Sequence, residues 1–414
     1  MKVYTLKLPL SIVCVVFAIG CFFMACTKKT ITPVTTAYNT GGTGTIGKDT
    51  SKTDSTASFN APTALALDAA GNIYVADYGN NLIRKISTKG VVSTVAGNGS
   101  QGSLNGKGTA SSFNGPTGLA VDAAGDIFVA DNNNNQIREI SAAGLVTTVA
   151  GSDSIGAVDG IGTAAYFFGP TGIEIDASGN LLVTDAGNNL IRKVTPAGAV
   201  STVAGNGAPG ATNGALLSAS FNNPTGIALD ASGNIYIADM LNSTIREINI
   251  GSSLVSTLAG GLDTTASING TGTAASFYFP NSLAVDASGN VYVSENINNV
   301  IRKITPGGVV TTFAGSGAAG QADSTGIKAS FNGPSGVAVD AAGNVYVADT
   351  YNNVIRKITP AGLVSTIAGN GLAGSSNGKA LSLRKPVNTI HINNLHTSSA
   401  AALLTKFAKK RSSQ

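Results

Sequence analysis

The sequence predicts an all-β fold that is built from six copies of one antiparallel unit. A segment typified by residues 71–86 recurs five more times along the 414-residue chain. Within each copy, short apolar or β-branched runs alternate with turn residues, and no 3.6-residue period indicates a helix. A proline precedes each copy at a spacing of 54 residues, with one interval of 56: Pro62, Pro116, Pro170, Pro224, Pro280 and Pro334.

Each unit is expected to contain four strands that are joined by turns. In the first copy, residues 63–67 and 73–76 form two short apolar runs, and residues 68–72 between them include the glycine that a tight hairpin favours. Residues 82–86 are rich in β-branched side chains and suit a third strand. Residues 91–96 supply the fourth strand, so that each unit forms one antiparallel sheet.

Six such sheets are expected to pack around a common axis. One small sheet cannot bury both of its faces, whereas sheets in a ring bury them against one another, and this arrangement is a six-bladed β-propeller. Residues 116–122, 72–77 and 80–84 have the sequences Pro-Thr-Gly-Leu-Ala-Val-Asp, Asn-Ile-Tyr-Val-Ala-Asp and Asn-Asn-Leu-Ile-Arg, which resemble the NHL repeat. The resemblance covers residues 59–369 and implies a six-bladed propeller of four-stranded blades. It implies no single activity, because such propellers serve as binding modules and as enzymes.

The first residues are predicted to export the protein. Lys2 and Lys7 precede an almost wholly apolar run over residues 8–25, which is the layout of a secretory signal. The residues that end at Cys26 resemble the lipobox of bacterial lipoproteins. We therefore interpret residues 1–26 as a lipoprotein-type signal peptide, with Cys26 as the lipidated residue.

The predicted location is the bacterial cell envelope, with a lipid anchor in a membrane. Cys21 is a second candidate for lipidation, and an uncleaved anchor helix is the alternative to a lipoprotein. Residues 27–58 are rich in Thr, Ser and Gly and are expected to form a flexible tether. All three cysteines lie in the leader, so the exported part has no disulfide and no cysteine-built metal site.

Residues 370–414 are interpreted as the degenerate start of a seventh repeat followed by a basic tail. The segment copies the loop that opens the other repeats as far as Pro386, but no hairpin sequence follows. Three alternatives stay open: a strand that closes the propeller, the stub of a truncated seventh blade, or a disordered basic end. A basic amphipathic helix over residues 400–411 is a further alternative.

The distribution of charge argues against a nucleic-acid partner. Residues 59–378 contain 13 Lys and Arg against 20 Asp and Glu, which gives a net charge of −7. The excess of basic residues in the whole chain lies at its two ends, so the predicted propeller has no positively charged surface that would bind a phosphate backbone.

No catalytic residue is predicted. Several loops, such as residues 97–102, match G-x-G-x-x-G, but none opens the helix that a dinucleotide site requires. The two histidines, His391 and His396, lie in the degenerate tail, which leaves a Ser-His-Asp triad without support.

The polar residues that repeat with the units are interpreted as architecture. An acidic residue ends the second strand, an arginine follows seven residues later, and we expect the carboxylate to accept hydrogen bonds from turn amides or from an arginine. Phenylalanines that precede the prolines are expected to plug the ends of the blades. The acidic residues are Asp77, Asp131, Asp185, Asp239 and Asp349, and Glu295 replaces the aspartate in the fifth copy; the arginines are Arg84, Arg138, Arg192, Arg246 and Arg356; the phenylalanines are Phe59, Phe113, Phe167, Phe221, Phe277 and Phe331.

Function is expected where the copies differ. The turn after the second strand and the long connection after the fourth should emerge at the same end of a blade, and long loops on a rigid scaffold commonly carry binding. We predict a binding module that recognises a protein or a glycan outside the cytoplasm through this face, without catalysis. The candidate binding residues are Tyr78, Tyr166, Phe168, Met240, Tyr278, Phe279, Asn296 and Tyr351.

The carboxylate of Glu174 supports an alternative function as an enzyme. Glu174 occupies the position on the innermost strand where the other copies have alanine. Propeller enzymes that resemble this chain, such as gluconolactonases, paraoxonases and the amidating lyase, hold a metal at the axis. The alternative is therefore a metal-dependent lactonase or lyase with an axial site near Glu174 and a divalent cation as its cofactor; the binding module needs no cofactor. A structural spacer without a ligand is the second alternative.

Overall fold

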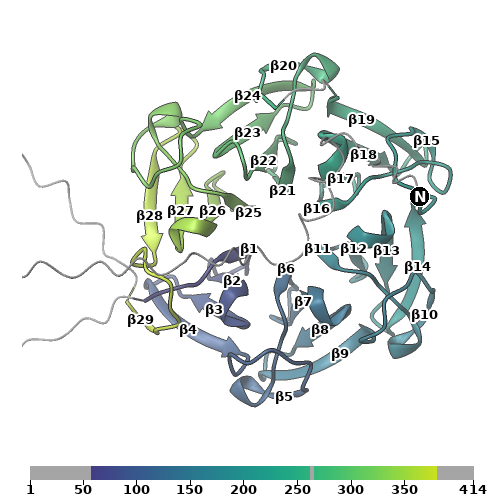
Figure 1. The fold of residues 1–414 in the computed structure, drawn as a ribbon, viewed down its shortest axis with the longest axis vertical. Coiled ribbons are helices and arrows are strands. Elements are labelled where there is room, and N and C mark those ends of the chain that lie inside the picture. Colours follow the sequence, from purple (N-terminus) through teal and green to yellow (C-terminus); the bar gives the residue numbers. More distant parts are fainter. Residues whose placement is uncertain (1–56, 262–264, 380–414) are drawn as a thin grey trace, which may run out of the picture. The chain divides into compact units, whose positions relative to one another are not determined.

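The computed structural model describes residues 57–261 and 265–379, which lie in one compact unit, Thr53–Gln414. These residues form six antiparallel sheets that follow one another around a central axis (Figure 1). The predicted all-β, six-bladed β-propeller is thereby confirmed. The predicted signal peptide, Cys26, most of the tether and the basic tail after residue 379 lie outside the described residues.

The first two strands of each blade carry the apolar runs. The innermost strand begins at the proline of the repeat, and the second ends at the repeated acidic residue. The innermost strands are β1 (Pro62–Leu67), β6 (Pro116–Val121), β11 (Pro170–Ile175), β16 (Pro224–Leu229), β21 (Pro280–Val285) and β25 (Pro334–Val339). The second strands are β2 (Ile73–Asp77), β7 (Ile127–Asp131), β12 (Leu181–Asp185), β17 (Ile235–Asp239), β22 (Val291–Glu295) and β26 (Val345–Asp349).

The third strand carries the repeated arginine and the fourth forms the outer part of the blade. The third strands are β3 (Leu82–Ile86), β8 (Gln136–Ile140), β13 (Leu190–Val194), β18 (Thr244–Asn249), β23 (Val300–Ile304) and β27 (Val354–Ile358). The fourth strands are β4 (Val91–Ala96), β9 (Leu145–Gly151), β14 (Ala199–Ala204), β19 (Leu254–Gly260), β24 (Val309–Ala314) and β28 (Val364–Ala368).

Five of the six blades have a fifth strand that the sequence did not predict. It is two residues long and comes from the loop that precedes the blade, so that β5 pairs with β9 of the next blade. The prediction of four strands per blade is therefore corrected to four or five. These edge strands are β5 (Gly106–Lys107), β10 (Gly160–Ile161), β15 (Gly214–Ala215), β20 (Gly270–Thr271) and β29 (Gly378–Lys379).

Short 3-10 helices mark the two kinds of connection at one end of the blades. After the second strand lie η1 (Tyr78–Asn80), η3 (Asn132–Asn134), η5 (Ala186–Asn188), η6 (Met240–Asn242) and η9 (Thr350–Asn352). In the long connections lie η2 (Gly108–Ala110), η4 (Gly162–Ala164), η7 (Gly272–Ala274) and η8 (Gly326–Lys328).

The ring closes through residues from both ends of the described chain. β29 pairs with β4 of the first blade, and Phe59 forms a parallel bridge with Ala373. Gly374 N donates a 3.0 Å hydrogen bond to Phe59 O, and Ser58 N donates one of 3.2 Å to Ser376 O. Among the alternatives for this segment, the described part is a closing strand. The propeller thus extends beyond residue 369, where the predicted propeller ended, to residue 379.

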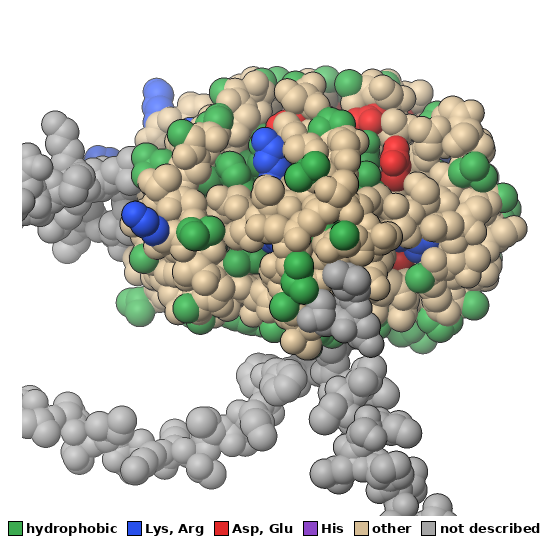
Figure 2. Space-filling view, turned by 90° about the horizontal axis from the view of Figure 1, so that it is seen from above, with side chains coloured by type: hydrophobic (Ala, Val, Ile, Leu, Met, Phe, Trp, Pro, Cys, Tyr) green, Lys and Arg blue, Asp and Glu red, His purple; other side chains and the backbone are tan. Residues whose placement is uncertain are grey.

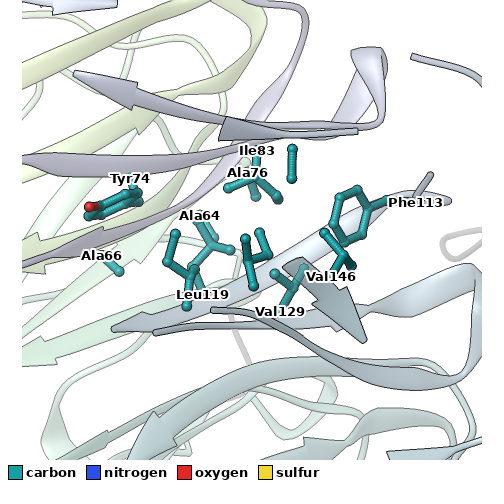
Figure 3. Close-up of a cluster of buried hydrophobic side chains, with 12 residues drawn as sticks. Ala64, Ala66, Tyr74, Ala76, Ile83, Phe113, Leu119, Val129 and Val146 are labelled. Carbon is teal, nitrogen blue, oxygen red and sulfur yellow. The ribbon is translucent and has the colours of Figure 1, made fainter. Parts of the chain in front are cut away.

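The hydrophobic core lies between neighbouring blades rather than within one. Ala64 and Ala76 of the first blade pack against Leu119 and Val129 of the second (Figure 3). Leu65, the intervening residue of β1, packs in the cluster with the sixth blade. Because successive side chains of a strand point to opposite faces, each blade buries both faces against its two neighbours.

The innermost strands approach one another closely enough to require glycine. A Cβ atom on Gly118 would lie 2.1 Å from the carbonyl oxygen of Thr171 in the next blade, and one on Gly172 would lie 2.5 Å from Thr225 O. No side chain fits at these distances, which accounts for the Pro-Thr-Gly sequence at the start of the strand.

The surface is poor in charge, as the composition with 12% charged residues requires. Figure 2 shows hydrophobic side chains spread among neutral polar ones, with few charged groups on the visible face. In residues 57–261 and 265–379, no helix has the length and apolar character needed to cross a bilayer.

Candidate functional site

A buried arginine anchors the long connection to each blade. In the second blade, Arg138 Nη1 donates a 2.9 Å hydrogen bond to Asp131 Oδ2. Its Nη2 donates to Leu104 O at 3.1 Å and to Asn105 Oδ1 at 2.8 Å, both in the preceding loop. The guanidinium carbon lies 5.5 Å from the centre of the Phe113 ring. One fully buried cation therefore joins a strand, a turn and a loop.

The same network occurs in all six blades. Each repeated arginine is fully buried, pairs with the acidic residue seven positions before it, and lies over the phenylalanine of its blade. Burial raises the pKa of Asp77, Asp131 and Asp185 to about 6, although the amide donors and the arginine act in the opposite direction. The expectation that these carboxylates bond turn amides and arginines is confirmed, so their oxygens are already engaged within the fold.

The turns and the long connections meet at one end of the blades, as predicted. Asn81 Nδ2 donates to Gly99 O at 3.3 Å, and Asn80 Nδ2 donates to Gly374 O at 2.8 Å. Asn134 of the second blade bonds Gly102 O in the same manner at 2.9 Å. We call this end the loop face; it comprises the turns after the second strands, with their 3-10 helices, and the six long connections.

The candidate binding residues all lie on the loop face. Three of them are exposed: Tyr78 at 37%, Phe168 at 44% and Tyr351 at 64%. The other five are partly buried: Tyr166, Met240, Tyr278, Phe279 and Asn296. They come from five of the six blades, and in the second blade asparagines stand at the corresponding positions of the turn.

The aromatic side chains rest on glycines. If Gly187 carried a Cβ atom, that atom would lie 2.5 Å from the ring of Phe168. A Cβ atom on Gly333 would lie 2.3 Å from the ring of Tyr351. Each ring therefore has one face against the backbone of its own blade. Tyr166 is held through its backbone instead, because Tyr166 O accepts a 3.1 Å hydrogen bond from Arg192.

The junction between the fourth and fifth blades departs from the others. At five junctions, an asparagine at the end of the turn accepts a hydrogen bond from the backbone amide before the next proline, as Asn81 Oδ1 does from Gly115 N at 3.0 Å. Ser243 holds this position in the fourth blade and has no side-chain amide to offer. Opposite it stands Phe279, whose φ of 52° is left-handed like that of the small residue or asparagine at the other five junctions. The ring of Phe279 makes an edge-on contact with Tyr278, with 4.6 Å between the ring centres.

A central channel runs between the innermost strands, with a cavity of about 160 Å³. Hydroxyl groups near its loop-face end join the blades: Thr63 Oγ1 donates to Pro116 O at 3.1 Å, and Thr117 Oγ1 donates to Pro170 O at 3.2 Å. This polar ring comprises Thr63, Thr117, Thr171, Thr225, Asn281 and Ser335.

Glu174 lies in the wall of this channel, which agrees with its expected place on an innermost strand. Burial raises the pKa of its carboxyl to about 7, and the hydrogen bond from the Ile175 amide, at 3.2 Å, opposes this only weakly. The described residues contain no cluster of three or more His, Cys, Asp or Glu side chains that could hold a metal. A divalent cation at the axis, and the metal-dependent enzyme built on it, stay predictions.

A family model for the NHL repeat matches residues 59–86, 113–140, 221–247 and 331–358. These matches cover four of the six blades. The chain carries NHL repeats. The other two copies are in the third and fifth blades. The third carries Glu174 in place of alanine and Leu182 in place of an aromatic residue, and the fifth carries Glu295 in place of aspartate.

Two relatives match most of the propeller. NHL repeat-containing protein 2 from Bos taurus is 28% identical over 333 residues, which are 71% of this chain and 46% of that protein. Protein SUPPRESSOR OF QUENCHING 1, chloroplastic, from Arabidopsis thaliana is 29% identical over 332 residues, which are 76% of this chain and 32% of that protein. The chain thus spans less than half of the length of these relatives.

A solved structure of an auxiliary nutrient binding protein from Bacteroides thetaiotaomicron has a TM-score of 0.56 and is 18% identical. The match covers 75% of this chain and 70% of that one. At this identity, the likeness bears on the fold alone.

Proposed function

We propose that this protein is a non-catalytic binding module that recognises a protein or a glycan through the loop face. One observation carries the proposal. The arginines, acidic residues and phenylalanines of the repeated network are buried and contact one another, whereas the side chains that differ between blades include exposed aromatic rings on one face. Because the buried networks hold the loops, these rings are presented on a fixed frame.

The chemistry of the rings suits a ligand with flat apolar surfaces. Tyr78, Phe168 and Tyr351 each expose part of a ring, and the glycines beneath Phe168 and Tyr351 limit the movement of those two side chains. Preordered aromatic rings lose little conformational entropy on binding, and they are enriched among residues that dominate binding energy.

Charge supports a neutral or weakly basic ligand. Residues 59–378 have a net charge of −7, so a polyanion would be repelled rather than steered towards the propeller. No nucleic acid is proposed as a partner.

A rim variant tests the proposal. Asparagine replaces Tyr78, Phe168 and Tyr351, since asparagines occupy the equivalent positions of the second blade at Asn132, Asn114 and Asn133. The wild-type protein is screened on glycan and peptide arrays, and Kd is then measured for the strongest ligand. We expect the rim variant to bind at least about tenfold more weakly, since rings of this kind contribute over 1 kcal/mol each at an interface.

A matched control separates the loop face from general apolar exposure. Serine replaces Leu145, Leu254 and Val309, which begin fourth strands and are exposed at 49%, 47% and 43%. This control should bind as the wild type does. Equal loss in both variants, or unchanged binding by the rim variant, would place the binding surface elsewhere.

We also propose that the protein is exported to a bacterial cell envelope and is anchored to a membrane by a lipid on Cys26. The apolar run that ends at a cysteine followed by polar residues supports this. Metabolic labelling with an alkyne fatty acid should be lost in Cys26→Ala and kept in Cys21→Ala. Labelling that survives in Cys26→Ala would remove this anchor from the proposal.

A further inference from the structure

Glu174 and the residue opposite it, Leu182, both differ from the residues found at these positions in the other blades. In the antiparallel register, Glu174 on β11 lies opposite Leu182 on β12. The other five blades place an alanine and an aromatic residue at these positions: Ala66 with Tyr74, Ala120 with Phe128, Ala228 with Tyr236, Ala284 with Tyr292, and Ala338 with Tyr346. Only the third blade has a glutamate, Glu174, in place of the alanine. The same blade has the smaller Leu182 in place of the aromatic residue that lies opposite.

The carboxylate of Glu174 has no cationic neighbour among the residues that line the channel. Its described hydrogen bond comes from the amide of Ile175 and engages Oε1, which leaves Oε2 free to accept. Among the described residues that line the channel, Glu174 is the only ionisable one, and apolar Ile173 and Ile227 form the adjacent walls. An uncompensated charge in such surroundings is costly, so a positively charged ligand would gain from pairing with it.

The residues around Glu174 favour an organic cation over a calcium ion. Calcium prefers six to eight oxygen ligands, and Glu174 supplies the one carboxylate among the described residues that line the channel. One carboxylate balances a single positive charge, and the apolar walls fit methylene groups. The cavity of about 160 Å³ has room for about five water molecules at about 30 Å³ each, or for an organic ion of similar size.

We propose that the channel binds a primary ammonium ion on a short aliphatic stem, with the Glu174 carboxylate as the acceptor and the apolar channel wall at Ile173 and Ile227 for the stem. This site is independent of the loop face. The ammonium group donates to Oε2, and the stem packs against Ile173 and Ile227.

The test is the thermal stability of the full chain at pH 8 with n-butylammonium chloride, compared between wild type and Glu174→Gln. A ligand that binds the native state raises the melting temperature, so the wild type should gain about 2 °C or more at saturating probe. Glu174→Gln should gain less than about a quarter of that shift. 1-Butanol and calcium chloride are the matched controls, and both should give smaller shifts than butylammonium. Equal shifts in the two proteins, no shift in wild type, or a larger shift with calcium would overturn the proposal.

A double variant guards against a loss of binding that comes from misfolding. Glu174→Ala with Leu182→Tyr recreates the alanine–tyrosine pair of four other blades, so it should fold, and it lacks the carboxylate. It should not bind butylammonium in isothermal titration. Wild-type affinity in this double variant would contradict the assignment.

Discussion

At the scale of single residues, Arg138 and its five counterparts show why a buried charge is kept in each blade. Arg138 satisfies Asp131, a loop carbonyl and a loop amide with one guanidinium group. Lysine cannot reproduce this geometry, because its ammonium is a single point with no planar fork. The arginine therefore defines the path of the loop that carries the candidate binding surface.

Arg138→Lys should destabilise the protein by about 3 kcal/mol, since it leaves buried partners unsatisfied while the charge is retained. Lys89→Arg is the matched control on an exposed residue, and its effect should stay within about 0.5 kcal/mol. Urea unfolding followed by circular dichroism measures both. An Arg138→Lys protein as stable as the control would show that the network contributes little.

Glu174 makes a second prediction at this scale, which concerns pH. Its pKa is about 7 in the folded protein against 4.5 for the free side chain, so the folded state holds an extra proton between these values. The contribution of Glu174 to stability is therefore fully present below pH 4.5 and is lost as the pH rises through 7. In the part of the chain that the structure describes, no other ionisable side chain lines the channel. Leu182 on the paired strand β12 and Ile227 on β16 of the next blade are apolar.

Glu174→Gln should accordingly melt close to wild type at pH 4.5 and above it at pH 8. The difference is at most about 3 kcal/mol, at 1.36 kcal/mol for each pKa unit, and is smaller because the side chain is partly exposed to the channel. Calorimetric melts of both proteins across pH 4.5–8 measure it. A constant difference across this range would show that the carboxyl titrates normally.

At the scale of elements, the ring depends on β29, a strand of two residues that the sequence did not predict. β29 joins the outer edge of the first blade, and its preceding loop supplies Ser376 O and Asn377 Oδ1 to Arg84. In the other blades, the equivalent loop arrives from the blade before. The first blade is thus completed by the end of the propeller, which couples the two ends of the chain.

A chain that ends after residue 369 should melt roughly 6 °C or more below one that ends after residue 379. The shorter chain leaves Arg84 without two acceptors in a buried site, which costs several kcal/mol. Differential scanning calorimetry of the two proteins measures the difference. Equal melting temperatures would mean that closure by β29 adds nothing to the fold.

The sequence predicts the elements that repeat and misses those that depend on neighbouring blades. The four long strands follow from apolar runs and turn residues within one copy. A strand of two residues such as Gly106–Lys107 has no pattern of its own and forms only because β9 of the next blade offers an edge. The coupling of Leu182 with Glu174 was likewise hidden, since it requires the register of β11 against β12, although Leu182 was visible as a departure from the aromatic residue of other copies.

At the scale of the whole molecule, the repeated residues and the variable residues have separate roles. The repeated arginines, phenylalanines and prolines lie inside and build six similar blades. Exposed aromatic residues that vary, such as Tyr78 and Tyr351, lie on the loop face. The candidate surface could be predicted because strand direction places both kinds of connection at the same end of every blade.

The most direct test of this account is amide hydrogen exchange of the intact protein with and without the strongest ligand from the array screen. We predict slower exchange in the turns at residues 78–81, 186–189 and 350–353 and in the long connections beside them. The hairpins between first and second strands, such as residues 68–72 and 176–180, should exchange at unchanged rates. Protection confined to those hairpins or to the outer strands would contradict the assignment of binding to the loop face.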